Sequence, residues 1–100
     1  MRATSKYILA VDDDPDIARL AEHTLSRRGF KVSSFTDALV ALEHFKTNHK
    51  NCSLVLSDIR MPGMNGYEFV MHVKEINSKV KVILMTAFEI QEKEFHLVFN

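Results

Sequence analysis

Three short stretches of the sequence end in oxygen-bearing side chains that could act together. Asp12, Asp13 and Asp14 follow one apolar run, Asp58 follows a second, and Thr86 follows a third. Carboxylates brought within a few ångströms repel one another by about a few kcal/mol per pair, unless a cation neutralises them. Mg²⁺ suits this role because it binds carboxylate and carbonyl oxygens and often completes its coordination with phosphate oxygens. The pattern indicates metal-assisted phosphoryl transfer to a carboxylate nucleophile.

Alternating strands and helices are needed to bring these stretches together. Short apolar runs predict four strands, over Tyr7–Val11, Lys31–Phe35, Ser53–Ser57 and Lys81–Met85. Helical periodicity and capping residues predict helices from Asp16 to a basic turn before Gly29, from Thr36-Asp37 onward, over Tyr67–Ile76, and from Glu89 onward. Chemistry typical of loops separates them, at Asn48–Asn51 and Met61–Gly66.

Each predicted helix has an apolar stripe that should face the sheet. The expected buried positions are Ile17, Leu20, Ala21, Thr24 and Leu25 in the first helix, Ala38, Leu42 and Phe45 in the second, and Phe69, Val70, Val73 and Ile76 in the third. The strands are apolar throughout, which is typical of a parallel sheet covered on both faces. In such an open α/β sheet, ligands bind beyond the carboxyl ends of the strands. Asp12, Asp13, Asp58 and Thr86 all belong to that edge.

Three motifs resemble the successive signatures of response-regulator receiver domains. They are Ile8-Leu9-Ala10-Val11-Asp12-Asp13-Asp14, Leu54-Val55-Leu56-Ser57-Asp58-Ile59-Arg60-Met61-Pro62-Gly63-Met64-Asn65-Gly66 and Val82-Ile83-Leu84-Met85-Thr86-Ala87. The resemblance runs from about Lys6 to the end of the chain. It implies an open parallel sheet of the flavodoxin type, with strand order 2-1-3-4, within a single domain over residues 1–100.

The resemblance also assigns roles to individual residues. Asp58 would accept the phosphoryl group, and Mg²⁺ would be held by Asp12, Asp13, Asp58 and the backbone carbonyl of Arg60. Within the acidic pair, Asp13 would bind the metal more directly and Asp12 through water. Thr86 would be the hydroxyl that moves to the phosphoryl group, with the Ala87 N–H as a second donor. The new phosphoryl charge would then shift the domain between two packings.

The chain departs from the family pattern near its end. The family also has a lysine after a fifth strand, and no lysine stands at the expected distance beyond Thr86, since Lys93 comes too early. The fifth strand and last helix are therefore expected to be missing. A second copy is expected to cover the exposed sheet edge or the apolar tail of Phe95, Leu97, Val98 and Phe99.

The amino-acid composition limits the classes of partner that the chain is expected to bind. The 13 basic and 13 acidic residues cancel, which argues against direct binding to nucleic acid, and no apolar run is long enough to span a membrane. The single Cys52 cannot form an internal disulfide, which favours a reducing, cytoplasmic location. The family resemblance implies a sensor histidine kinase or phosphotransfer protein as partner, and an output domain in the parent chain.

Three other functions were weighed against a phosphoacceptor domain. A Mg²⁺-dependent phosphohydrolase would carry its nucleophile after the first strand, and Asp58-Ile59-Arg60 lacks that enzyme's second carboxylate. A nucleotide-binding domain would need a glycine-rich loop after Val11. An interaction scaffold derived from a receiver domain, unable to switch without the lysine, stays open. The five histidines have no metal-ligand spacing and are expected in surface or partly buried positions.

Overall fold

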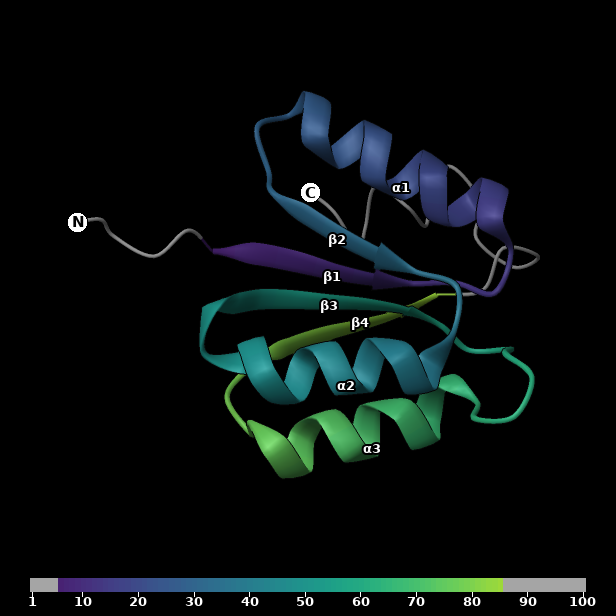
Figure 1. Cartoon of the computed structure of the whole chain (residues 1–100), viewed down its shortest axis with the longest axis vertical. Coiled ribbons are helices and arrows are strands. Elements are labelled where there is room, and N and C mark those ends of the chain that lie inside the picture. Colours follow the sequence, from purple (N-terminus) through teal and green to yellow (C-terminus); the bar gives the residue numbers. More distant parts are fainter. Residues whose placement is uncertain (1–5, 86–100) are drawn as a thin grey trace.

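The computed structural model describes residues 6–85. Within this range, strands and helices alternate regularly along the chain (Figure 1). The elements are β1 (Tyr7–Val11), α1 (Pro15–Arg27), β2 (Val32–Phe35), α2 (Ala38–Asn48), the 3₁₀ helix η1 (His49–Asn51), β3 (Cys52–Asp58), α3 (Gly66–Ile76) and β4 (Lys81–Met85). The predicted element order is therefore confirmed for this part of the chain, with boundaries that shift by one or two residues.

All described strand pairs are parallel, and they form one sheet in the order β2-β1-β3-β4. This confirms the expected open α/β sheet and its strand order. The central strands β1 and β3 pair Leu9 with Val55 and Val11 with Ser57. Their carboxyl ends consequently lie side by side at one edge of the sheet, which we call the carboxyl edge.

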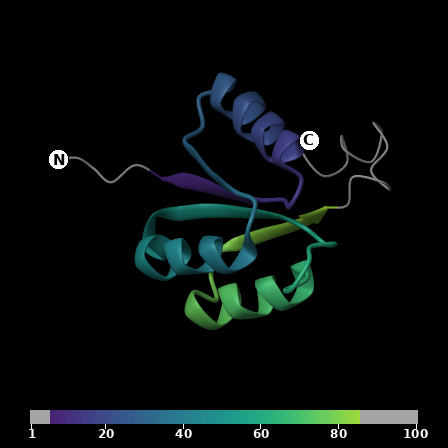
Figure 2. The ribbon, with the colours of Figure 1, turned by 45° about the vertical axis from the view of Figure 1, so that its right-hand side comes forward.

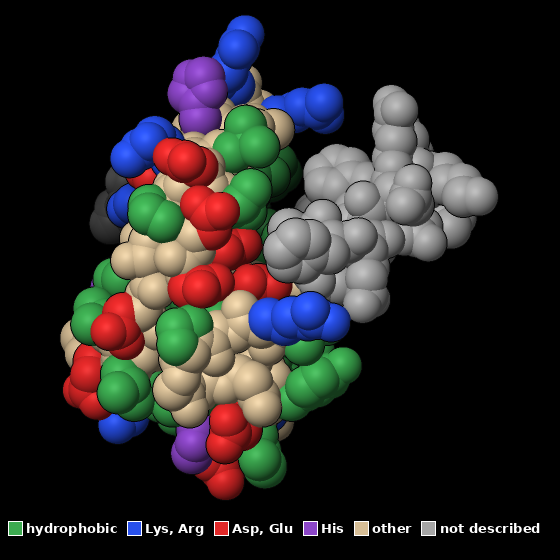
Figure 3. Space-filling model, turned by 90° about the vertical axis from the view of Figure 1, so that its right-hand side faces the viewer, with side chains coloured by type: hydrophobic (Ala, Val, Ile, Leu, Met, Phe, Trp, Pro, Cys, Tyr) green, Lys and Arg blue, Asp and Glu red, His purple; other side chains and the backbone are tan. Residues whose placement is uncertain are grey.

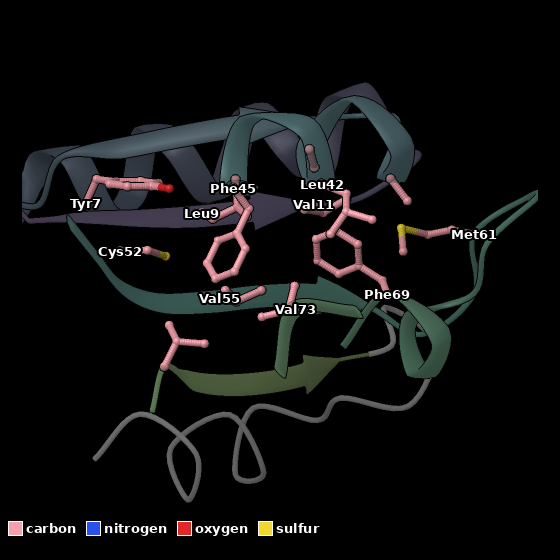
Figure 4. Packing of buried hydrophobic residues seen from close by; sticks show 13 residues of the cluster. Tyr7, Leu9, Val11, Leu42, Phe45, Cys52, Val55, Met61, Phe69 and Val73 are labelled. Carbon is pink, nitrogen blue, oxygen red and sulfur yellow. The ribbon is translucent and has the colours of Figure 1, made fainter. Parts of the chain in front are cut away.

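Helices cover both faces of the sheet (Figures 1 and 2). Alternate residues of the central strands divide the core between these faces, as strand geometry requires. Leu9 and Val55 pack toward α2 and α3, while Ala10 and Leu56 pack toward α1. Figure 4 shows the larger cluster, in which Phe45 and Phe69 are fully buried between the strands and the helices. The central strands are thereby held rigidly on both sides.

Each of the three described α-helices starts at the carboxyl edge and has a side chain that caps its first turn. The Asp14 side chain accepts a hydrogen bond from the Asp16 N–H, and Pro15 is the first residue of α1. The Asp37 side chain accepts hydrogen bonds from two N–H groups in the first turn of α2. Asn65 and Glu68 form a reciprocal capping box at the start of α3. These caps end each loop at a fixed residue, so the loops that carry the polar side chains are short and well defined.

The predicted buried stripe is correct for α2, partly correct for α3 and partly wrong for α1. Ala38, Leu42, Phe45, Phe69 and Val73 are buried, while Val70 and Ile76 of α3 are half-buried. In α1, Ala18 is the buried residue, whereas Leu20 is 60% exposed and Thr24 is also exposed. The sheet contacts the side of α1 that carries Ala18, Ala21 and Leu25, and Leu20 points away from that side.

Several expectations fall on residues beyond the described range. Thr86, Ala87, the helix expected from Glu89, and the apolar tail all lie outside it. Among described strands, β4 pairs only with β3, so its outer edge has no described partner strand. Coverage of that edge by a second copy stays a prediction, as does the single-domain assignment.

Candidate functional site

Three carboxyl groups meet at the carboxyl edge of the sheet. Asp12 and Asp13 directly follow β1, and Asp58 is the last residue of β3, the neighbouring strand. One carboxylate oxygen from each residue lies within 4.8 Å of the other two. Figure 3, which looks onto this edge, shows acidic side chains gathered there. The structure thus brings together the three side chains that the sequence selected from separate stretches.

Asp12 is the most strongly perturbed of these carboxyl groups. It is only 7% exposed, and its Oδ1 accepts a hydrogen bond from the Asp14 N–H at 2.9 Å. Burial raises the pKa of Asp12 to about 6, the Asp14 N–H opposes the rise, and the charges of Asp58, Asp13 and Asp14 add to it. A carboxylate at this position is therefore costly to ionise unless positive charge is supplied.

Asp58 lies in a similar environment with more hydrogen-bond donors. It is 8% exposed, and burial raises the pKa of its carboxyl group. A hydrogen bond from the Arg60 N–H lowers the pKa of Asp58, and the charge of Asp13 raises it. Asp13 also lies within hydrogen-bond distance of Asp58, while remaining exposed to solvent. Asp13 therefore forms the open side of the cluster.

The donor chemistry of the cluster fits a hard divalent cation. All three candidate ligand atoms are carboxylate oxygens, and the described residues contain no other comparable cluster of histidine, cysteine or acidic side chains. Carboxylate oxygen is the ligand that Mg²⁺ prefers in proteins. A cation would also remove the repulsion that raises the pKa of Asp12 and Asp58. The type of ligand atom and the negative charge of the cluster therefore both favour a divalent cation.

The loop after β3 positions Asp58 through its backbone and one buried side chain. The Ile59 N–H donates to the Met85 carbonyl at 2.8 Å, and the Gly66 N–H donates to the Ile59 carbonyl at 2.8 Å. Met61 is buried in the core cluster below the loop, and Gly63 has a left-handed φ of 81°. The loop is consequently tied to β4, to the core and to the start of α3.

The sequence analysis did not predict the backbone donor of Asp58. Arg60 is expected to offer its carbonyl to a metal ion, and the structure adds a hydrogen bond from the Arg60 N–H to the Asp58 carboxylate. Side-chain identity carries no signal for such backbone contacts, because any residue other than proline supplies the same N–H. The histidines follow expectation where described: His44 contacts the rings of Tyr7 and Phe35, and His49 contacts Phe45.

The raised pKa of Asp12 predicts an unusual pH dependence for the metal-free chain. A raised carboxyl pKa means that the folded state binds a proton more tightly than the unfolded state. Between about pH 4 and pH 6 the free energy of unfolding should therefore decrease as pH rises, by about 1 to 3 kcal/mol. Asp12→Asn should remove most of this slope. Urea unfolding in a chelator at several pH values measures it, and equal slopes in both chains would contradict the prediction.

Comparisons with known proteins show which family the sequence resembles. The profile of the response regulator receiver domain family matches residues 8–98. The C4-dicarboxylate transport transcriptional regulatory protein DctD of Rhizobium meliloti (strain 1021) is 35% identical over 80 residues, which is 80% of this chain and 17% of that protein. The match thus spans about a sixth of this relative.

Solved structures share the fold. The response regulator TrrA of Thermotoga maritima in complex with Mg²⁺-BeF superposes with a TM-score of 0.74 and 34% identity, over 84% of this chain and 71% of that chain. The complex of histidine kinase ThkA with TrrA gives a TM-score of 0.76 and 33% identity, over 87% of this chain and 73% of that chain.

No helix in the described part of the chain has the length and apolarity to cross a membrane.

Proposed function

Because the chain belongs to the response regulator receiver domain family, we propose that it is a phosphoacceptor domain of a two-component pathway and that Asp58 accepts the phosphoryl group. The observation that carries the proposal is the placement of Asp58 within 4.8 Å of the oxygens of Asp12 and Asp13. Asp58 is the member that lies on β3, and a backbone hydrogen bond from Arg60 helps to hold its carboxylate in place.

In the proposed mechanism, Mg²⁺ is held by Asp12, Asp13, Asp58 and the Arg60 carbonyl. When bound, the ion supplies positive charge that offsets the carboxylates and attracts phosphate oxygens. The Arg60 N–H would orient the Asp58 carboxylate for attack on phosphorus. Burial of Asp58 reduces the number of water molecules that compete with it. The chain acts as a signalling domain and not as an enzyme that turns over a diffusible substrate.

Thr86 and Ala87 are proposed to respond to the new phosphoryl group. They lie outside the described residues, but the register supports their role, since Met85 pairs with Asp58 across β3 and β4. Thr86 follows Met85 directly, which brings the backbone at the end of β4 next to the nucleophile. Phosphorylation adds about 1.5 to 2 negative charges and three acceptor oxygens, enough to draw a hydroxyl donor. The Thr86 hydroxyl and the Ala87 N–H would supply the new hydrogen bonds.

We propose a histidine kinase or a phosphotransfer protein as the phosphoryl donor, and an output domain in the parent chain. The structure that pairs TrrA with the kinase ThkA, and the much greater length of the transcriptional regulator DctD, support these assignments. The one cysteine, Cys52, is buried and free, which supports a cytoplasmic location.

The direct test is incubation of the chain with acetyl phosphate in Mg²⁺ or in a chelator, followed by intact mass measurement. We expect the mass of one added phosphoryl group in Mg²⁺ and almost none in the chelator, because the three carboxylates otherwise repel the anionic donor. Hydroxylamine should remove the group, since it cleaves acyl phosphates and leaves serine or threonine phosphates intact.

Other results of this test would favour one of the competing functions. A folded chain that binds Mg²⁺ but gains no phosphoryl group would support the interaction scaffold. A hydroxylamine-resistant adduct would place the phosphoryl group on a residue other than an aspartate. Steady turnover of a generic phosphomonoester would contradict the assignment as a signalling domain and favour the phosphohydrolase.

A further inference from the structure

Positive charge gathers at the edge of the sheet where the strands begin, which we call the amino edge. All three described α-helices run back from the carboxyl edge, so their last turns lie there too (Figure 1). The described segments that form this edge are residue 6 and residues 28–31, 49–51 and 77–80. They contain no aspartate or glutamate, and their lysines and arginines are all exposed: Lys6, Arg28, Lys31, Lys50 and Lys79.

The pairing of the strands brings these cations into one row. The Ile8 N–H donates to the Lys31 carbonyl at 2.8 Å, and Tyr7, which follows Lys6, pairs with Cys52 at the start of β3. Neighbouring strands lie about 4.8 Å apart, so an edge of four strands is about 15 Å wide. An extended peptide covers this width with about four to five residues.

Helix dipoles explain only part of the charge near this edge. Arg27, Lys46 and Lys74 lie in last turns, where the partial negative charge of a helix end favours a cation. Lys46 also pairs with Glu43 at 3.1 Å. The five cations of the amino edge lie outside the α-helices, and no acidic side chain within residues 6–85 forms an ion pair with them. A negatively charged partner would relieve their mutual repulsion.

An exposed aromatic ring lies among these cations. Phe30 stands between Arg28 and Lys31 in the chain, is 53% exposed, and is the one large exposed hydrophobic residue in the described amino-edge segments. The end of α1 fixes its backbone, because Gly29 has a φ of 93° and the Phe30 N–H donates to the Leu25 carbonyl at 3.1 Å. A partner at this edge would meet positive charge and one apolar contact.

These features fit an acidic peptide better than a DNA duplex or a membrane. A chain without net charge has little long-range attraction to DNA, and a sugar-phosphate backbone offers no apolar partner for Phe30. One exposed ring is too little to anchor the chain in a bilayer. We infer that the amino edge binds a short, extended, acidic segment of a partner protein, and that Phe30 contacts an apolar side chain of that segment. This surface lies at the opposite end of the strands from Asp58.

The test is fluorescence anisotropy with a labelled, glutamate-rich peptide that has one central phenylalanine. Lys31→Gln and Lys50→Gln should each weaken binding about two- to fivefold at low salt, because each removes one exposed charge contact. Added salt should weaken binding to the parent chain. Arg19→Gln is the control, since Arg19 is an exposed cation that pairs with Asp16 near the start of α1, and it should leave the affinity unchanged.

Phe30→Ala separates the apolar contact from the charge. It should weaken binding of the phenylalanine peptide about two- to tenfold, and leave binding of the same peptide with alanine at that place nearly unchanged. Urea unfolding should show that Lys31→Gln is at least as stable as the parent chain, because it relieves repulsion. Asp58→Asn should bind the peptide as the parent does, so failure of the proposed phosphoryl transfer and failure of this inference are distinguishable.

Absence of binding at low salt, or equal weakening by Arg19→Gln, would overturn the inference. Tighter binding of a single-stranded oligonucleotide with the same number of charges would assign the amino edge to nucleic acid instead. Co-sedimentation with phosphatidylserine vesicles at matched salt, without peptide binding, would assign it to a membrane surface. Self-association that Lys31→Gln abolishes, again without peptide binding, would assign it to the acidic edge of a second copy.

Discussion

A chain in which Asn replaces Asp58 is expected to gain no phosphoryl group from acetyl phosphate. The amide is close to the carboxylate in shape but is neutral and a very poor nucleophile, so the adduct should fall below about one hundredth of the parent level. The substitution also removes one of three mutually repelling carboxyl groups whose burial is unfavourable when ionised. We therefore expect the metal-free variant to be at least as stable at neutral pH as the parent chain.

Loss of phosphoryl transfer without loss of stability in this variant is the result that supports Asp58 as the acceptor. Intact mass measures the adduct, and urea unfolding in a chelator measures the stability. Asp37→Asn is the matched control, because Asp37 lies at the same edge of the sheet but caps α2, and asparagine caps helices equally well. It should keep the full adduct. A phosphoryl group that persists in Asp58→Asn would show that another residue is the acceptor.

Gly66→Ala is expected to cost more stability than any other single methyl addition to the glycines of this chain. A Cβ at Gly66 would lie 2.3 Å from the Asp58 carbonyl oxygen and 2.8 Å from the Ile59 Cα, both of them backbone atoms. Backbone cannot rotate aside as a flexible side chain does, so α3 must move away from the end of β3. We expect a loss of about 2 to 4 kcal/mol in the free energy of unfolding.

Gly63→Ala provides the comparison within the same loop. Gly63 has a φ of +81° but open space where its Cβ would be, so its replacement should cost only about 1 kcal/mol, from the left-handed backbone conformation. Because Gly66 is the first residue of α3 and lies against Asp58, Gly66→Ala should also reduce phosphorylation of the folded fraction. Denaturant unfolding and intact mass measure the two effects. Equal losses of stability in the two variants would contradict the steric argument.

These two predictions imply that Asp58, the proposed nucleophile, depends on the start of α3 as well as on β3. The Arg60 N–H of the loop donates to the Asp58 carboxylate, and the loop is closed by the hydrogen bond from the Gly66 N–H to the Ile59 carbonyl. The capping box of Asn65 and Glu68 fixes where α3 begins. Changes in this loop are therefore expected to alter the site even where they touch no carboxylate.

Much of this arrangement could be predicted from the sequence, because it depends on local patterns. Continuous apolar runs such as Tyr7–Val11 predicted strands buried on both faces, and the acidic residues and Pro15 that follow this run predicted the start of the first helix. Parallel strands place their carboxyl ends at one edge, so the proximity of Asp12, Asp13 and Asp58 followed from the order of the elements. The family resemblance assigned roles to these residues.

The remaining features were decided by the tertiary structure. The exposure of Leu20, the need for a side chain no larger than hydrogen at Gly66, and the raised pKa of Asp12 each depend on atoms from distant parts of the chain. Sequence periodicity shows that a helix has an apolar face, but the angle at which the helix packs determines which residues are covered. In the same way, composition shows that a carboxylate is present, whereas its pKa is set by the solvent, charges and N–H groups that packing leaves around it.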